Sequence, residues 1–93
     1  MQLIIMGEVK LSRQAEKLKL GLYEHYKKKR YKVLGVVVHS ETLVEHVLYK
    51  ALYGNRLTWV RPLKMFTEKV EIDDGKKVPR FRYVGSRLNK LLP

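Results

Sequence analysis

Hydrophobic and polar residues alternate along much of the chain, and this pattern predicts β-strands. The clearest strand spans residues 31–39, where aromatic and β-branched side chains dominate. Gly35 interrupts this run and indicates a bulge or a sharp bend. The three valines that follow it predict burial on both faces of the strand, with the N-terminal residues as the second cover.

Further short strands are predicted where aromatic and β-branched residues lie between turn signals. They cover residues 21–26, 57–61, 70–72 and 78–83. Gly54-Asn55 and Asp73-Asp74-Gly75 are hairpin signals, and Pro79 indicates an edge strand. Short strands at such regular intervals predict a mostly β fold, specifically a small antiparallel SH3-like barrel.

Three other segments have weaker patterns. Ser12 could cap a short helix whose apolar residues recur at helical spacing until Gly21. Residues 44–53 fit either a strand or a short helix, and Pro62 opens a helical turn over residues 63–66. Residues 3–10 fit a short strand.

These elements predict one domain with short extensions. We expect an N-terminal extension over residues 1–19, with a helical or strand element packed on the barrel. A single β-rich domain follows over residues 20–84, and residues 85–93 form a short basic tail.

The charge of the chain indicates an anionic partner. Its 93 residues contain 20 Lys and Arg against 9 Asp and Glu, a net charge of +11. Residues 19–83 alone carry 15 basic and 7 acidic side chains, so the excess belongs to the folded body. Such a field favours nucleic acid or a phosphorylated small molecule, although solubility alone would also account for it.

Composition also excludes several classes of protein. Without Cys there are no disulfides, thiolate zinc sites or cysteine nucleophiles. The apolar runs fall far short of the ~20 residues that span a bilayer. No basic residue precedes the short N-terminal apolar run, so no secretory signal is predicted and we expect a cytoplasmic location. No cofactor-binding motif is found.

Several motifs occur in a fixed order between residues 21 and 81. They are Gly21-Leu-Tyr-Glu-His-Tyr26, Val33-Leu-Gly35, His39-Ser-Glu-Thr42, Tyr49, Leu52-Tyr-Gly54, Trp59-Val-Arg-Pro62, Met65-Phe66 and Val78-Pro-Arg-Phe81. In these residues the chain resembles the small bacterial domain-of-unknown-function family numbered 1653. The resemblance implies a compact β-rich domain and no particular activity, cofactor or partner. The N-terminal extension and the very basic run at residues 27–30 depart from the family's pattern.

No catalytic residue or metal site is predicted. His39-Ser40-Glu41-Thr42 contains the residue types of a hydrolytic triad, but consecutive side chains diverge and cannot form one. These residues fit a turn or the mouth of a pocket. The three histidines lack the spacing of a zinc-binding motif.

Arginine and lysine positions give the predicted ligand site. Arg61 and Arg80 each adjoin a proline, and their planar guanidinium groups suit a shared anion pocket. Alternatively they pair with Glu41, Glu45 or Glu68 and stabilise the fold. The densest positive charge supplies phosphate contacts, and Tyr53 with His39 would wall the pocket. The predicted ligand-binding set is Lys27, Lys28, Lys29, Arg30, His39, Glu41, Tyr53, Arg61 and Arg80.

The aromatic residues leave more than one function open. We assign Trp59, Phe66 and Phe81 to the core, and Tyr26, Tyr31 and Tyr53 to the surface. The first hypothesis is a binding module for an anionic ligand, either nucleic acid or a nucleotide. The second is a peptide- or protein-interaction domain whose aromatic residues form a groove for a protein partner. The third is a small hydrolase that uses His39 and Glu41.

Overall fold

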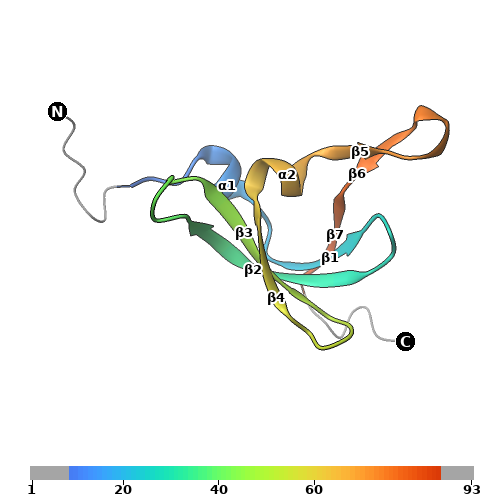
Figure 1. The fold of residues 1–93 in the computed structure, drawn as a ribbon, viewed down its shortest axis with the longest axis horizontal. Coiled ribbons are helices and arrows are strands. Elements are labelled where there is room, and N and C mark those ends of the chain that lie inside the picture. Colours follow the sequence, from blue (N-terminus) through green and yellow to red (C-terminus); the bar gives the residue numbers. More distant parts are fainter. Residues whose placement is uncertain (1–8, 87–93) are drawn as a thin grey trace.

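A five-stranded antiparallel sheet carries two short helices on one face (Figure 1) in the computed structural model, which describes residues 9–86. The elements follow in the order α1 (Arg13–Lys17), β1 (Gly21–His25), β2 (Arg30–Val38), β3 (Glu45–Ala51), β4 (Thr58–Pro62), α2 (Leu63–Thr67), β5 (Lys69–Glu71), the 3-10 turn η1 (Asp73–Gly75), β6 (Lys77–Pro79) and β7 (Phe81–Gly85). The predicted mostly β, antiparallel class is confirmed.

The main sheet is open and does not form the predicted barrel. Its strand order is β4-β3-β2-β1-β7, and within residues 9–86 the outer strands β4 and β7 do not pair with each other. The chain between them folds into α2 and a separate two-stranded ribbon of β5 and β6 instead of a closing strand. The prediction of an SH3-like barrel is therefore not confirmed.

Strand β2 has the bulge that the sequence predicts. Its register with β3 shifts between Val33 and Gly35. Burial of the valine run on both faces is wrong, because Val37 is 37% exposed. Among the described residues, both helices pack on one face of the sheet, which we call the inner face, and the other is the outer face.

Helix α1 is held by its cap and by an acidic side chain from β3. The Ser12 hydroxyl accepts a hydrogen bond of 3.1 Å from the Ala15 amide, as its position predicts. The same hydroxyl and the Ser12 amide donate to the Glu45 carboxylate, both at 2.6 Å. These bonds lower the pKa of Glu45. Ala15 is buried, so this short helix is fixed to the sheet.

The hydrophobic core lies between the helices and the inner face. Its buried members are Ala15, Tyr23, Val33, Val47, Tyr49, Leu63, Phe66 and Phe81. Pro62 precedes α2 as predicted, and α2 places the Phe66 ring flat on that of Phe81, with centroids 4.1 Å apart. Residues 44–53, for which the sequence allowed two structures, form strand β3.

The last predicted strand is divided between two sheets. β6 pairs with β5 in the ribbon, whereas β7 pairs with β1 in the main sheet. Arg80 lies between β6 and β7, at the point where the chain passes from one sheet to the other.

Two predicted segments fall largely outside the described residues. Of the strand predicted over residues 3–10, only Val9 and Lys10 are described, and they have no regular structure. Of the predicted tail, Gly85 belongs to β7 and residues 87–93 are outside the described range. Neither helix in the described part of the chain is long and apolar enough to cross a membrane.

Candidate functional site

Aromatic rings line the inner face beside α2, from the buried Tyr49 and Phe81, which Phe66 of α2 contacts, to the partly exposed Tyr31 and Tyr53. We define the aromatic face as His25, Tyr31, Tyr49, Tyr53 and Phe81. The ring centroid of Tyr31 lies 5.4 Å from the ring centroid of Tyr49 and 5.5 Å from those of Tyr53 and Phe81. His25 packs edge-on to Phe81 at 4.9 Å. Four of these residues come from four different strands and Tyr53 from the turn after β3, so the sheet largely sets their spacing.

Arg61 extends from β4 over this aromatic face. Its guanidinium carbon lies 5.6 Å from the centre of the Phe81 ring, and its Nε donates a 3.3 Å hydrogen bond to the Tyr49 hydroxyl. Within residues 9–86, Arg61 forms no ion pair with a carboxylate. Its two Nη groups donate no hydrogen bond to a described residue, so they can receive an anion.

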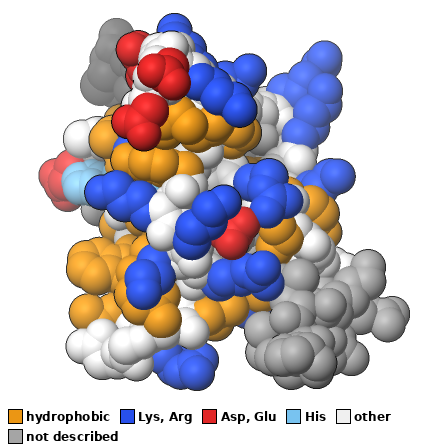
Figure 2. All heavy atoms as spheres, turned by 90° about the vertical axis from the view of Figure 1, so that its right-hand side faces the viewer, with side chains coloured by type: hydrophobic (Ala, Val, Ile, Leu, Met, Phe, Trp, Pro, Cys, Tyr) orange, Lys and Arg blue, Asp and Glu red, His pale blue; other side chains and the backbone are white. Residues whose placement is uncertain are grey.

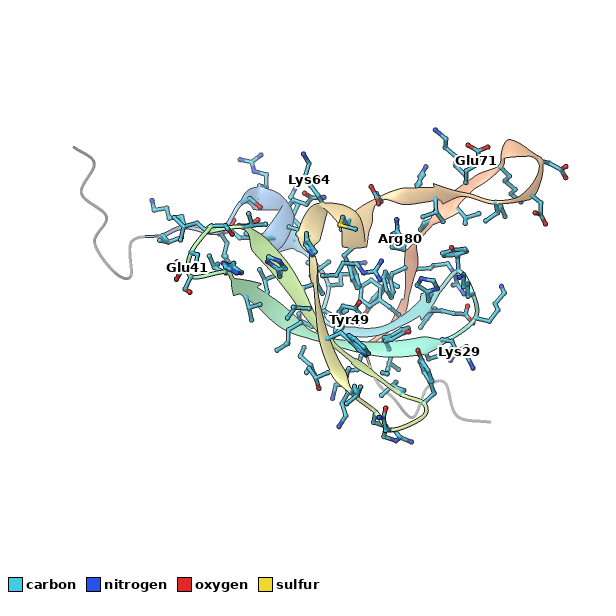
Figure 3. All side chains as sticks on the ribbon, viewed as in Figure 1. Lys29, Glu41, Tyr49, Lys64, Glu71 and Arg80 are labelled. Carbon is cyan, nitrogen blue, oxygen red and sulfur yellow. The ribbon has the colours of Figure 1, made fainter. Side chains whose placement is uncertain are left out.

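Arg80 has the opposite environment. Its Nη2 pairs with the Glu68 carboxylate at 2.6 Å, and its Nε donates to the Met65 carbonyl at 3.1 Å. These bonds join the end of α2 to the chain just before β7, where Figure 3 labels Arg80. Of the two alternatives that the sequence left open, pairing with Glu68 is confirmed for Arg80 and not found for Arg61.

His25 lies close enough to both Arg61 and Arg80 for their positive charges to lower its pKa. Burial among the rings lowers its pKa most, followed by the positive charges of Arg61, Lys27 and Arg80. Its Nδ1 accepts a 3.1 Å hydrogen bond from the Lys27 amide, so the neutral ring carries its proton on Nε2. Sequence reasoning missed this residue as a site member, although its alternation with Tyr23 on one strand places it on the inner face.

The four basic residues of the β1–β2 turn spread in different directions. Lys29 places its ammonium group 5.0 Å above the Tyr53 ring, and Lys27 lies 5.8 Å from the Tyr26 ring. Arg30 pairs with Glu24 at 3.9 Å. Lys28 lines a groove of about 330 Å³ beside the β5–β6 ribbon.

Figure 2 views the end of the molecule that carries this turn. Lys and Arg side chains spread from the top to the bottom of this view, with hydrophobic side chains between them and acidic side chains at the upper left, at the left margin and in the middle. The predicted run of phosphate contacts is therefore dispersed, and Lys29 is the member whose ammonium group lies over a ring of the aromatic face.

His39 and Glu41 lie away from this site. The β2–β3 register puts Val38 beside Glu45 at one end and Tyr31 beside Ala51 at the other, close to Tyr53. Figure 3 accordingly shows Glu41 and Lys29 at opposite ends of the sheet. The prediction that His39 and Tyr53 wall one pocket is wrong, because the full length of β2 separates them.

His39 has a structural contact in this turn. Its Nδ1 accepts hydrogen bonds from the amides of Glu41 and Thr42, at 3.1 and 3.2 Å. Its ring lies 6.1 Å from that of His46. Within residues 9–86, no group of three His, Cys, Asp or Glu side chains is placed to hold a metal ion.

Trp59 is exposed, which corrects its assignment to the core. Phe66 and Phe81 are buried as predicted, whereas Trp59 is 50% exposed on the outer strand β4. It pairs with Tyr49 across β3 and β4, and opposed residues in antiparallel strands share a face of the sheet. Trp59 therefore extends the aromatic face to the sheet edge, a placement that no local sequence signal indicates.

Tyr53 is 40% exposed, as predicted for a surface residue. Its hydroxyl shares a 2.6 Å hydrogen bond with that of Tyr31. Burial and this hydrogen bond raise the pKa of Tyr31, so its hydroxyl stays protonated at neutral pH.

Comparison with known proteins agrees with this fold. The model of the family described as "Protein of unknown function (DUF1653)" matches residues 21–83. The chain belongs to this family. A DUF1653 protein from Bordetella bronchiseptica, known from its crystal structure, is similar to the chain, with 33% sequence identity and a TM-score of 0.71. The match covers 78% of this chain and 95% of the other. No curated protein matches the chain.

Proposed function

We propose that this DUF1653 protein is a binding module whose aromatic face takes an anionic ligand that carries bases, either nucleic acid or a nucleotide. The observation that supports the proposal is the guanidinium group of Arg61. It lies over a layer of aromatic rings and has no carboxylate partner within residues 9–86.

Arg61 and Lys29 would contact the phosphates. A guanidinium group offers two parallel donors to phosphate oxygens, which a carboxylate partner would otherwise occupy. Lys29 adds a second positive charge beside Tyr53. His25 adds a neutral N–H donor next to Arg61.

Trp59 and Tyr53 would contact the bases. Both rings are about half exposed and lie at the open margin of the aromatic face. Stacking of one base on an aromatic side chain contributes about 1–3 kcal/mol and tolerates any base. Bases in a duplex already stack on each other, so we expect single strands to bind more tightly than duplexes.

The direct test is fluorescence anisotropy of a labelled single-stranded oligonucleotide, titrated with protein at about 50 and 200 mM salt. Arg61→Gln should weaken binding by roughly 10- to 100-fold, because it removes a charge-assisted hydrogen bond to the ligand. It should also reduce the salt slope by about 0.7, the contribution of one phosphate on a single strand.

Lys32→Gln is the matched control. It removes the same charge from an exposed residue of β2 that alternates with Tyr31 and Val33, and therefore lies on the outer face. Equal losses in the two variants would mean that only the overall charge matters. That result, or no binding at the lower salt, would overturn the proposal.

A peptide-binding function is the second candidate, and one observation favours it. Strand β4 is an outer strand of the described sheet. The side chains of Trp59 and Val60 on this strand, and of Leu57 just before it, are exposed. An extended peptide could pair with such an edge through backbone hydrogen bonds. Binding of this kind would change little with salt and would survive Arg61→Gln, so the same titrations separate the two functions.

A further inference from the structure

A second basic hollow lies between α1 and the main sheet, away from Arg61. Its volume is about 640 Å³, and its lining consists of Arg13, Gln14, Lys17, Leu18, Lys19, Tyr23, Thr67 and Tyr83. Three of these residues are cationic and none is acidic. Three positive charges around one hollow repel each other, and a bound anion would relieve that repulsion.

The backbone that carries these cations is fixed to the domain. Glu45 holds the start of α1 through two hydrogen bonds to Ser12. Gln14 donates a 3.0 Å hydrogen bond to the Thr67 hydroxyl at the end of α2. Arg13 and Lys17 therefore extend from a helix that is held on both sides.

Lys19 is fixed by a different set of contacts. The Tyr23 hydroxyl donates a 2.6 Å hydrogen bond to the Lys19 carbonyl, and burial raises the pKa of Tyr23 to about 12. The Lys19 ammonium group lies 5.0 Å from the centre of the Tyr83 ring. The Lys19 ammonium group therefore lies against one face of the Tyr83 ring.

We infer that this hollow binds phosphate groups through Arg13, Lys17 and Lys19, as an anion site separate from the aromatic face. Phosphate suits the hollow because its several oxygens can accept from three cations at once. The three cations precede residue 21, where the match to the family model begins, so that match does not include them. The ligand is either a free oligophosphate or the phosphates of a nucleic acid backbone.

Inorganic tripolyphosphate is the first probe, because it has phosphates and no base. In ¹H–¹⁵N NMR titrations of the full chain, we expect saturable shifts at the amides of Arg13, Lys17, Lys19 and Tyr83. The double variant Arg13→Gln/Lys17→Gln should weaken this binding at least tenfold. The control Lys32→Gln/Lys69→Gln, with the same charge change at exposed residues elsewhere, should stay within about twofold of the original protein.

Weak shifts spread over all lysines, or equal losses in both double variants, would overturn the inference. If the first double variant loses its fold, Lys19→Gln provides the same comparison against Lys32→Gln. Titration of the same variants with a single-stranded oligonucleotide then identifies the source of the phosphate. Weakened oligonucleotide binding in Arg13→Gln/Lys17→Gln indicates backbone phosphates, and unchanged oligonucleotide binding with lost tripolyphosphate binding indicates a free oligophosphate.

Arg61→Gln separates this inference from the proposed function. It should leave tripolyphosphate binding in the hollow unchanged, whatever its effect on oligonucleotides. Loss of tripolyphosphate binding in Arg61→Gln would place the phosphate on the aromatic face and overturn the second site.

Discussion

The inner face of the sheet has two halves built from the same kinds of residue. Where α2 covers the sheet, its Phe66 ring stacks on that of Phe81 with 4.1 Å between centroids, and both rings belong to the buried core. Beyond α2, Tyr31, Tyr53 and Trp59 lie on the same sheet with rings partly in solvent. The position of one five-residue helix therefore decides which aromatic residues are core and which form a surface.

The arginines of the two halves differ in the same way. Arg80, beside α2, has its carboxylate partner in Glu68 and a backbone carbonyl for its Nε. Arg61 donates to the Tyr49 hydroxyl and lies over the Phe81 ring, and within residues 9–86 it has no carboxylate partner. Arg80 is therefore paired within the fold, whereas the guanidinium group of Arg61 can be paired by a ligand.

The largest change in stability is expected when a side chain is removed from the part of the inner face that α2 covers. Phe66→Ala removes the ring that α2 packs on Phe81 and should lower the free energy of unfolding by about 3–5 kcal/mol. Urea denaturation followed by circular dichroism measures this change. Met65→Ala, on the exposed side of the same helix, is the control and should cost well under half as much. Similar losses in both variants would show that α2 does not divide the face as described.

Trp59 tests the open half with a smaller effect. Trp59→Ala should weaken binding of a single-stranded oligonucleotide about tenfold, within the 1–3 kcal/mol of one stacked base, and leave stability nearly unchanged. Val60→Ala is the matched control, since Val60 is 55% exposed on the same strand and points to the other face. Equal loss in both variants would favour a ligand that pairs with the edge of β4 over one that stacks on the aromatic face.

The smallest expected effect is a pH dependence of stability and of oligonucleotide affinity, which arises from protonation of His25. Its pKa lies below the ordinary value of 6.5, so the unfolded chain takes up this proton more readily than the folded one. Stability without ligand should therefore decline as pH falls below about 6.5. A bound anion beside His25 favours the charged ring, so oligonucleotide affinity should rise a few-fold between pH 7 and 5.5.

His25→Gln checks this assignment. It removes the titrating ring and should flatten both pH profiles, measured by thermal melts and by anisotropy across the same range. An affinity that rises as steeply in His25→Gln as in the original protein would assign the effect to other groups.

Local patterns predicted those parts of the fold that depend on neighbouring residues. The Ser12 cap, the bulge at Gly35 and the helix after Pro62 all follow from the chemistry of one or a few positions. The open sheet does not, because it depends on where the chain between β4 and β7 travels. The division at Arg80 likewise reflects pairing of β6 with β5 and of β7 with β1, which no short window contains.

The candidate site shows the same limit. The prolines beside Arg61 and Arg80 singled out both residues, but only the tertiary structure distinguishes the paired arginine from the unpaired one. The basic hollow was missed because Lys19 and Tyr83 are far apart in sequence and meet through the pairing of β1 with β7.

The open sheet also affects how copies of the protein behave toward one another. Strands β4 and β7 are the outer strands of the sheet within residues 9–86, and strand edges that have no neighbour can align with those of another copy and start aggregation. A net charge of +11 opposes that approach through mutual repulsion, and salt weakens the repulsion. A polyanion that neutralises the protein would remove this protection at the same time as it binds. The protein should therefore be most prone to self-association at the point where bound negative charge balances its own.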